Sequence, residues 1–251
     1  MIHPKFPRAA RPAILAAGIA SLLGFAVSAP AAVTFLGVAS GDASNNDAIV
    51  WTRATDDAAP GAAVSLTLQY STDNTFSTGV TSASVTTATA AAGDNTAKYN
   101  ITGLAPATRY YYRFTGANNA VSNVGTFKTA PLATTNYPLH FAFSGDCDGL
   151  IRPYALASQV PGKQLDFFMF LGDTEYETSA SIGSAAVTST GNIPDPTTVA
   201  ATATQSQLFN DFSRKYREQF LAVNSGGQNC LQPFFAGQGN YTTYDNHELG
   251  N

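Results

Sequence analysis

The chain has 251 residues, of which 44% are hydrophobic and only 12% are charged, and its formal net charge is -4. The remaining residues are mainly small or polar. This composition excludes a coiled coil and a chain that is disordered because of a high charge content. Of the 13 basic residues, Lys5, Arg8 and Arg11 lie at the start, which leaves 10 against 17 acidic residues, so nucleic-acid binding is not expected.

The first 31 residues show the three parts of a secretory signal peptide. The basic start precedes an apolar run over 13–27, and small residues follow, with Ala29 and Ala31 at the positions that a signal peptidase reads. The run is shorter than the ~20 apolar residues of a membrane span, which favours cleavage over an anchor. We therefore expect a Sec-type signal, a mature start near Ala32 or Val33, a secreted or periplasmic location, and no stable membrane insertion.

Residues 33–131 have the pattern of an all-β unit. Short runs of alternating or β-branched residues are separated by turn residues, and they lie at 48–52, 64–70, 82–87, 110–114 and 124–129. In the fourth run, Tyr110, Tyr112 and Phe114 point to one face, since side chains alternate along a strand. Strands at this spacing predict a β-sandwich of about 100 residues.

From Leu139 onward the pattern changes to strand, loop and helix. Residues 139–143 and 165–171 are apolar throughout, which is typical of strands in a sheet covered on both faces. Residues 150–164 have room for a short helix, and 178–205 are a long insertion poor in charge. A packing helix is expected around Leu208, Phe212, Tyr216 and Phe220, and a last strand at 241–244.

Two cysteines, Cys147 and Cys230, are present. In an exported protein they could pair with each other, but two cysteines do not make a disulfide framework. The alternative is that each is a small buried apolar residue.

Metal-binding side chains follow three of the predicted strands. Asp146 follows the first apolar strand, Asp173 and Tyr176 follow the second, and Asn246 and His247 follow the last. Carboxylate, phenolate, amide and imidazole groups are ligands for Fe, Mn, Zn or Ca. An aspartate between two cations can bridge them, and two such cations can clamp a phosphate and activate a water. Because ligands bind at the carboxyl ends of strands in such sheets, we expect the motifs to meet there.

Two stretches of the β unit resemble known families. Residues 104–110 are similar to the L-x-P-x-T-x-Y stretch of fibronectin type III domains, in which the tyrosine ties a loop to its strand, and Trp51 is then expected in the core. Residues 38–42, with Ser40-Gly41-Asp42, and residues 50–53 are similar to the opening of the N-terminal domain of PhoD-type alkaline phosphatases. Ser40-Gly41-Asp42 itself is expected to be a turn without chemistry.

The order G-D, G-D-x-x-Y, N-H-E resembles the calcineurin-like metallophosphoesterases, especially the purple acid phosphatases, and the surrounding residues are closer to the PhoD type. The resemblance implies that Asp146 binds the first metal, that Asp173 bridges the metals, that Tyr176 is a phenolate on a ferric ion and that Asn246 binds the second metal. His247 would contact the phosphate or protonate the leaving oxygen. Many PhoD-type enzymes have cysteine as first ligand, so Cys147 is the alternative to Asp146. The implied metals are Fe³⁺ with Ca²⁺, with Mn²⁺ or Zn²⁺ as alternatives.

The expected fold is therefore a fibronectin type III-like sandwich over 33–131 followed by an incomplete α/β metallophosphoesterase domain of the four-layer α/β/β/α type over 137–251. The only histidines are His3, His140 and His247, whereas the family's later motifs supply two or three more, so the chain is interpreted as a truncated, N-terminal part.

The predicted function is an exported metal-dependent phosphatase or phosphodiesterase that acts on phosphate mono- or diesters. The alternative is a secreted, non-catalytic fibronectin-like binding or adhesion module with a degenerate phosphatase-like tail. A histidine-rich motif of the family further along the reading frame would favour the enzyme over the module.

Export should depend on residues 1–31. N-terminal sequencing of material secreted by the expressing cell should begin near Ala32, because the small residues before it form the cleavage site. Recovery of the intact N-terminus outside the cytoplasm would contradict this prediction.

Overall fold

The computed structural model describes residues 32–147, 154–174, 204–221, 223 and 226–249. Its first part is a two-sheet sandwich, as expected. One sheet contains β1 (Val33–Gly41), β2 (Asp47–Asp56) and β5 (Thr96–Thr102), and the other contains β3 (Ser65–Ser71), β4 (Thr81–Thr86), β6 (Arg109–Thr115) and β7 (Gly125–Lys128). The short helices α1 (Ala90–Gly93) and η1 (Ala117–Asn119) lie in its loops. The predicted signal peptide lies outside the described residues.

Alternating side chains fill the core of the sandwich. Tyr112, Phe114 and Phe127 are fully buried between the sheets, as the alternation along the β6 sequence predicts. Tyr110 packs against this core, and its hydroxyl accepts a hydrogen bond of 2.9 Å from the backbone N–H of Ala105. This bond is the expected tyrosine corner, which fixes the loop before β6.

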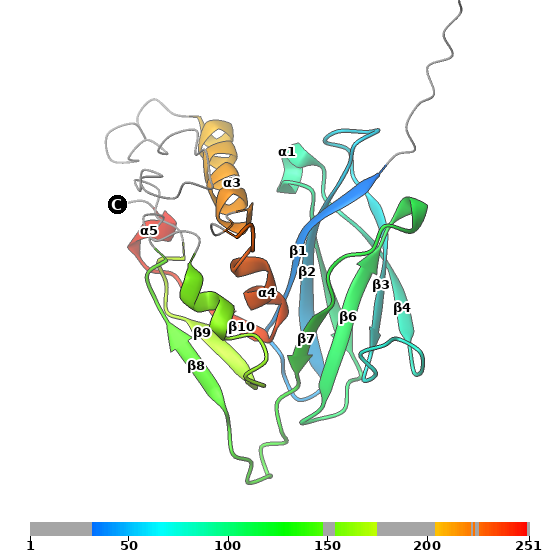
Figure 1. Ribbon diagram of the computed structural model, residues 1–251, viewed down its shortest axis with the longest axis vertical. Coiled ribbons are helices and arrows are strands. Elements are labelled where there is room, and N and C mark those ends of the chain that lie inside the picture. Colours follow the sequence, from blue (N-terminus) through cyan, green and yellow to red (C-terminus); the bar gives the residue numbers. More distant parts are fainter. Residues whose placement is uncertain (1–31, 148–153, 175–203, 222, 224–225, 250–251) are drawn as a thin grey trace, which may run out of the picture.

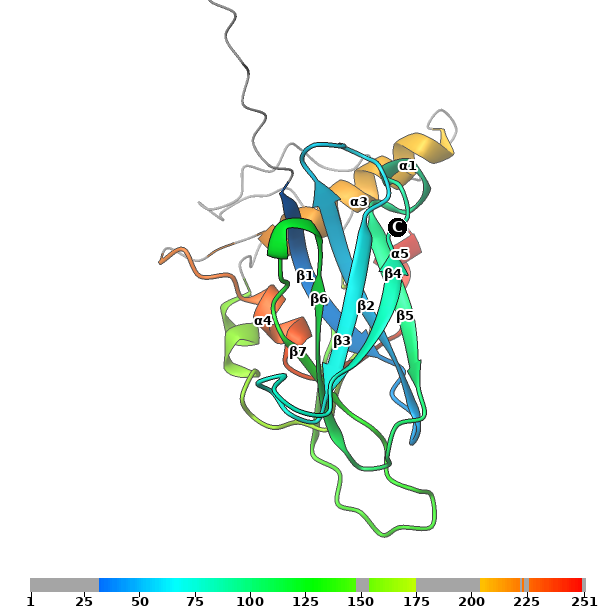
Figure 2. The same cartoon turned by 90° about the vertical axis from the view of Figure 1, so that its right-hand side faces the viewer.

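The second part contains three parallel strands and several helices. The strands are β8 (Phe141–Ser144), β9 (Phe167–Phe170) and β10 (Gly239–Thr242). The helices are η3 (Ala155–Gln159), α3 (Gln205–Leu221), α4 (Leu231–Ala236) and α5 (Asn246–Leu249). Figure 1 shows α3 and α4 between these strands and the sandwich, and Figure 2 shows both helices behind the sandwich. No helix of the described residues is long and apolar enough to span a bilayer.

The two parts share a single sheet. The end of β1 pairs in parallel with β10, Ser40 opposite Gly239 and Gly41 opposite Asn240, which gives the strand order β5-β2-β1-β10-β9-β8. A Cβ atom on Gly41 would lie 2.5 Å from the Asn240 carbonyl oxygen, so a glycine is needed where the two strands meet. The expected turn at Ser40-Gly41-Asp42 is thus wrong for Ser40 and Gly41, which end a strand.

Trp51 does not lie in the core of the sandwich, which corrects the sequence-based expectation. Its neighbours Val50 and Thr52 are fully buried between the sheets, so Trp51 points to the opposite face of β2. There its ring contacts Phe220 of α3, with ring centroids 5.9 Å apart. The tryptophan therefore holds the helical layer against the sheet.

The helical layer packs on one face of β8–β10, and the other face is exposed. Phe234 of α4 contacts Phe168 and Phe170 on β9, with ring centroids 4.8 and 5.9 Å apart. On the opposite face Phe143 is 65% exposed and Met169 37% exposed. The expected cover on both faces of these strands is therefore absent among the described residues.

An ion pair links β7 to the start of β9. Lys128 Nζ lies 2.7 Å from Asp166 Oδ1, and Asp166 Oδ2 accepts a bond of 2.9 Å from the backbone N–H of His140. Burial alone would lower the pKa of Lys128 and raise that of Asp166. Burial is the largest single effect on each group, but the hydrogen bonds and neighbouring charges together outweigh it. The pKa of Lys128 therefore lies above, and that of Asp166 below, its ordinary value.

Asp166→Asn should lower the free energy of unfolding by about 1 kcal/mol at neutral pH, because it weakens a charged hydrogen bond between partly buried groups. The pKa of Asp166 is lower in the folded state, so its contribution should be present above pH ~4 and disappear as the pH falls further. Urea unfolding of both proteins from pH 3 to 8 measures the difference. Asp57→Asn, on an exposed residue, is the control, and a pH-independent difference would contradict the prediction.

Candidate functional site

The three predicted strand-end motifs lie at one edge of the sheet. Asp146 follows β8, Asp173 follows β9 and His247 follows β10, and all three strands are parallel. The backbone N–H of Asp146 donates to the Gly172 carbonyl at 3.3 Å, and that of Cys147 donates to the Asp173 carbonyl at 2.7 Å. The N–H of His247 donates to Asp173 Oδ1 at 3.1 Å. The structure therefore brings together motifs that are up to 101 residues apart in the numbering of the chain.

Both aspartates adopt the left-handed backbone conformation directly after their strands, with φ of 57° at Asp146 and 50° at Asp173. Non-glycine residues seldom take this conformation, and aspartate tolerates it better than most. The two carboxylates differ in environment, because Asp173 is only 6% exposed whereas Asp146 is exposed. Asp173 is thus the buried centre of the strand-end edge, and Asp146 lies at its rim.

Gly172 allows the loop after β10 to lie directly over the end of β9. Its φ is +100°, and a Cβ atom there would lie 2.5 Å from Asp245 Cβ and 2.8 Å from Asp245 N. Both the conformation and the close approach require glycine. Gly172 therefore determines how closely the loop after β10 approaches the end of β9.

Glu248 joins two of the three motifs, although the sequence predicted no role for it. Its Oε2 accepts from the N–H groups of Asp173 (3.0 Å) and Asp245 (2.8 Å), and its Oε1 accepts from Thr174 N (2.5 Å) and Thr174 Oγ1 (2.8 Å). Burial alone would raise the pKa of the Glu248 carboxyl, but these hydrogen bonds outweigh burial and hold it below its ordinary value. The spacing from Asp245 to Glu248, that of a helix capping box, was the available sequence signal.

The remaining predicted residues have different environments. Asn246 is exposed at the start of α5, His247 is half-buried, and Tyr176 lies outside the described residues. Cys147 is half-buried, and its carbonyl accepts a hydrogen bond of 3.1 Å from the Tyr154 hydroxyl. No disulfide joins Cys147 to Cys230, so the pairing that the sequence left open does not form.

The side chains at this edge are of types that bind metal ions, but too few of the described ones lie together to hold one. Two carboxylates and an amide oxygen suit Fe³⁺, Ca²⁺, Mn²⁺ or Zn²⁺. Within the described ranges, however, no group of three or more His, Cys, Asp and Glu side chains could hold a metal ion. The described residues at this edge therefore do not make a complete metal shell by themselves.

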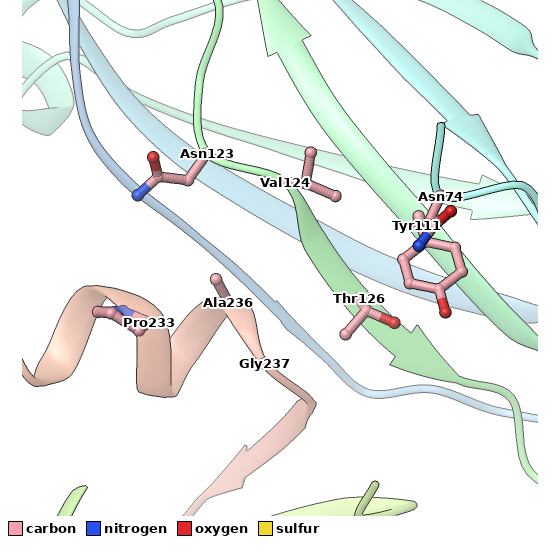
Figure 3. A pocket seen from close by; sticks show the side chains of 8 residues that line it. All are labelled: Asn74, Tyr111, Asn123, Val124, Thr126, Pro233, Ala236 and Gly237. Atoms are coloured by element: carbon pink, nitrogen blue, oxygen red, sulfur yellow. The ribbon is translucent and has the colours of Figure 1, made fainter. Parts of the chain in front are cut away.

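Two cavities lie near the helical layer. One, of about 580 Å³, is lined mainly by apolar side chains beside Asp146 and Cys147. The other, of about 440 Å³, is a cleft between the sandwich and α4, with Tyr111, Thr126 and Gly237 in its lining (Figure 3). No residue of the strand-end motifs lines the second cleft, so the strand ends and the first cavity remain the candidate site.

Comparisons with known proteins point to a phosphatase family. Residues 23–131 match the family described as PhoD-like phosphatase, N-terminal domain. Alkaline phosphatase D of Bacillus subtilis (strain 168) is 27% identical over 223 residues, which cover 86% of this chain and 35% of that protein. A solved structure of PhoD superposes with a TM-score of 0.64 at 26% identity, over 86% of this chain and 39% of that chain. The chain thus spans about a third of the length of its curated relative.

Gly172→Ala should loosen the contact between the β9 and β10 strand ends. It combines backbone strain with a clash against Asp245, so we expect a loss of about 2 kcal/mol or more in the free energy of unfolding. Gly162→Ala is the matched control, because Gly162 also has a positive φ (+85°), but a Cβ atom there would meet nothing within 4 Å among the described residues. Chemical denaturation of both variants tests the prediction, and equal losses would contradict it.

Proposed function

We propose that this protein is part of an exported, metal-dependent phosphatase or phosphodiesterase. Residues 23–131 match the PhoD-like phosphatase N-terminal domain family, and the chain is similar to PhoD over 86% of its length. The substrate class is a phosphate mono- or diester. The division into a fibronectin type III-like sandwich (33–131) and the first part of an α/β metallophosphoesterase domain (137–251) belongs to this proposal, as does export by residues 1–31.

The observation that carries the proposal is the convergence of the strand-end motifs. Asp173 is buried between the loops after β8 and β10, and it contacts both of them through hydrogen bonds. Phosphate chemistry needs charged groups held in fixed positions around one point, which such an edge provides. A plain turn with a Gly-Asp sequence would not require this arrangement.

The proposed roles follow the order of the motifs. Asp146, Asp173, Tyr176 and Asn246 are proposed as metal ligands, with Asp173 between two metals and Cys147 as the alternative to Asp146. The proposed pair is Fe³⁺ with Ca²⁺, and Mn²⁺ or Zn²⁺ are the alternatives; such metals supply positive charge and activate water. The shell requires ligands beyond the described residues.

His247 is proposed as the residue that protonates the leaving oxygen of the ester. Its backbone N–H is fixed by Asp173 Oδ1 at 3.1 Å, and its side chain is half-buried at the same edge. An imidazole in this position can bind a phosphate oxygen or deliver its proton to the departing alkoxide. The proton then leaves with the alcohol product.

One observation favours the alternative of a secreted, non-catalytic binding module. The described part of the chain contains no group of His, Cys, Asp and Glu that could hold a metal by itself. A sandwich followed by a degenerate strand-end edge would then bind a ligand or a surface without chemistry. The assay below separates the two functions.

The activity prediction compares the 251-residue chain with the longest polypeptide that its reading frame encodes. The longer product should hydrolyse p-nitrophenyl phosphate or its bis-ester, and a chelator should abolish the activity. Asp173→Asn should abolish it as well, and His247→Ala should lower turnover by ~10²–10⁴ while sparing bound metal. Chromogenic assays measure these effects, with metal analysis alongside.

Asp73→Asn is the control for this assay, because it changes a carboxylate in the sandwich, away from the strand ends. We expect no activity from the 251-residue chain. Activity in that chain would contradict the interpretation that it holds only part of the site. A longer product that is inactive with each of the four metals would support the binding module instead.

A further inference from the structure

We propose that Glu248 is a positioning residue that fixes the loop of Asp173 and the loop of His247 in place relative to each other. Its carboxylate accepts hydrogen bonds from donors on two different strand-end loops. The inference rests on the proposed function for the meaning of Asp173 and His247, but its geometry and its test do not.

Each oxygen of Glu248 has a separate task. Oε1 holds the loop after β9, because it accepts from both the N–H and the hydroxyl of Thr174. Oε2 joins the loops, because it accepts from Asp173 N at 3.0 Å and from Asp245 N at 2.8 Å. A carboxylate is well suited to this position, since it accepts several bonds and donates none when ionised.

The contact between the loops is reciprocal. Glu248 accepts the N–H of Asp173, while Asp173 Oδ1 accepts the N–H of His247 at 3.1 Å. The two carboxylates therefore determine both the distance and the rotation between the β9 loop and the first turn of α5. A shift of either loop would break bonds from the other, so Asp173 and His247 keep a fixed relative position.

The hydrogen bond to Asp245 alone would indicate only a local role, at the start of α5. An acidic residue that reaches back to the N–H three positions earlier is a common way to begin a helix. Glu248 also accepts hydrogen bonds from Asp173 and Thr174, about 75 residues away in sequence, and these donors lie outside α5, in the loop after β9. Its role therefore extends from the helix to the alignment of two motifs.

Glu248→Gln tests the proposal in the 251-residue chain. Glutamine keeps the shape of the side chain but places an NH₂ group opposite two donors, whichever oxygen it replaces. Measured by NMR, amide hydrogen exchange at Asp173, Thr174 and Asp245 should become about tenfold faster or more, while exchange at Val50 in the sandwich core should not change. The imidazole resonance of His247, assigned with His247→Gln, should shift.

Asp73→Asn is the matched control, because Asp73 is also a carboxylate that accepts backbone bonds, from Thr75, Ser77 and Thr78. It should leave the His247 resonance and the three strand-end amides unchanged. A residue with only a general effect on stability would accelerate exchange throughout the chain and would not shift His247 selectively.

Unchanged exchange at Asp173 and Thr174 in Glu248→Gln, or uniform acceleration that includes Val50, would overturn the inference. If Glu248→Gln does not fold, Thr174→Val becomes the deciding variant. It removes one bond to Oε1 and should accelerate exchange at Thr174 itself, and no effect there would also overturn the inference. Failure of the proposed function appears in the phosphatase assay and leaves these results valid.

Discussion

The parallel pairing of β1 with β10 is the constraint on which the rest of the structure depends. It places Ser40 opposite Gly239 and Gly41 opposite Asn240, and it continues the sheet from the sandwich into β8–β10. Without this pairing, the edges of β1 and β10 that face each other would be open to solvent. It also fixes where β10 ends, and therefore where Asn246 and His247 lie relative to the strands before them.

Aromatic contacts make the helical layer part of the same unit. Phe235 of α4 stacks on Phe220 of α3, at 5.2 Å, and on Phe170 of β9, at 6.0 Å, while Phe220 reaches Trp51 on β2. The ring contacts therefore run from the sandwich sheet, through both helices, to β9, the strand that precedes Asp173. Closely packed rings of this kind stabilise the contact between the sandwich sheet, the helices and β9.

Local patterns in the sequence predicted the parts of the fold that depend on local physics. The alternation at Tyr110, Tyr112 and Phe114 and the tyrosine corner both follow from residues close in sequence, and both are confirmed. The pairing of β1 with β10 could not be predicted, because Gly41 and Asn240 are 199 positions apart and no sequence periodicity indicates their contact. Trp51 was misplaced for the same reason: its partner Phe220 belongs to a distant helix, and β-strand alternation alone does not say which face is the core.

The candidate site shows the same division between local and distant causes. The motif positions predicted that Asp146, Asp173 and His247 would gather at one edge, because parallel strands end together. They are held there mainly by features of the backbone. Gly172 lies where no residue with a side chain would fit, two aspartates have positive φ, and backbone N–H groups donate hydrogen bonds to Glu248. Such an edge tolerates little movement, since each loop supplies the hydrogen-bond partners of the next. Geometry of this kind is useful where charged groups must keep fixed distances. The pairing of β1 with β10 connects this edge to the sandwich through one continuous sheet.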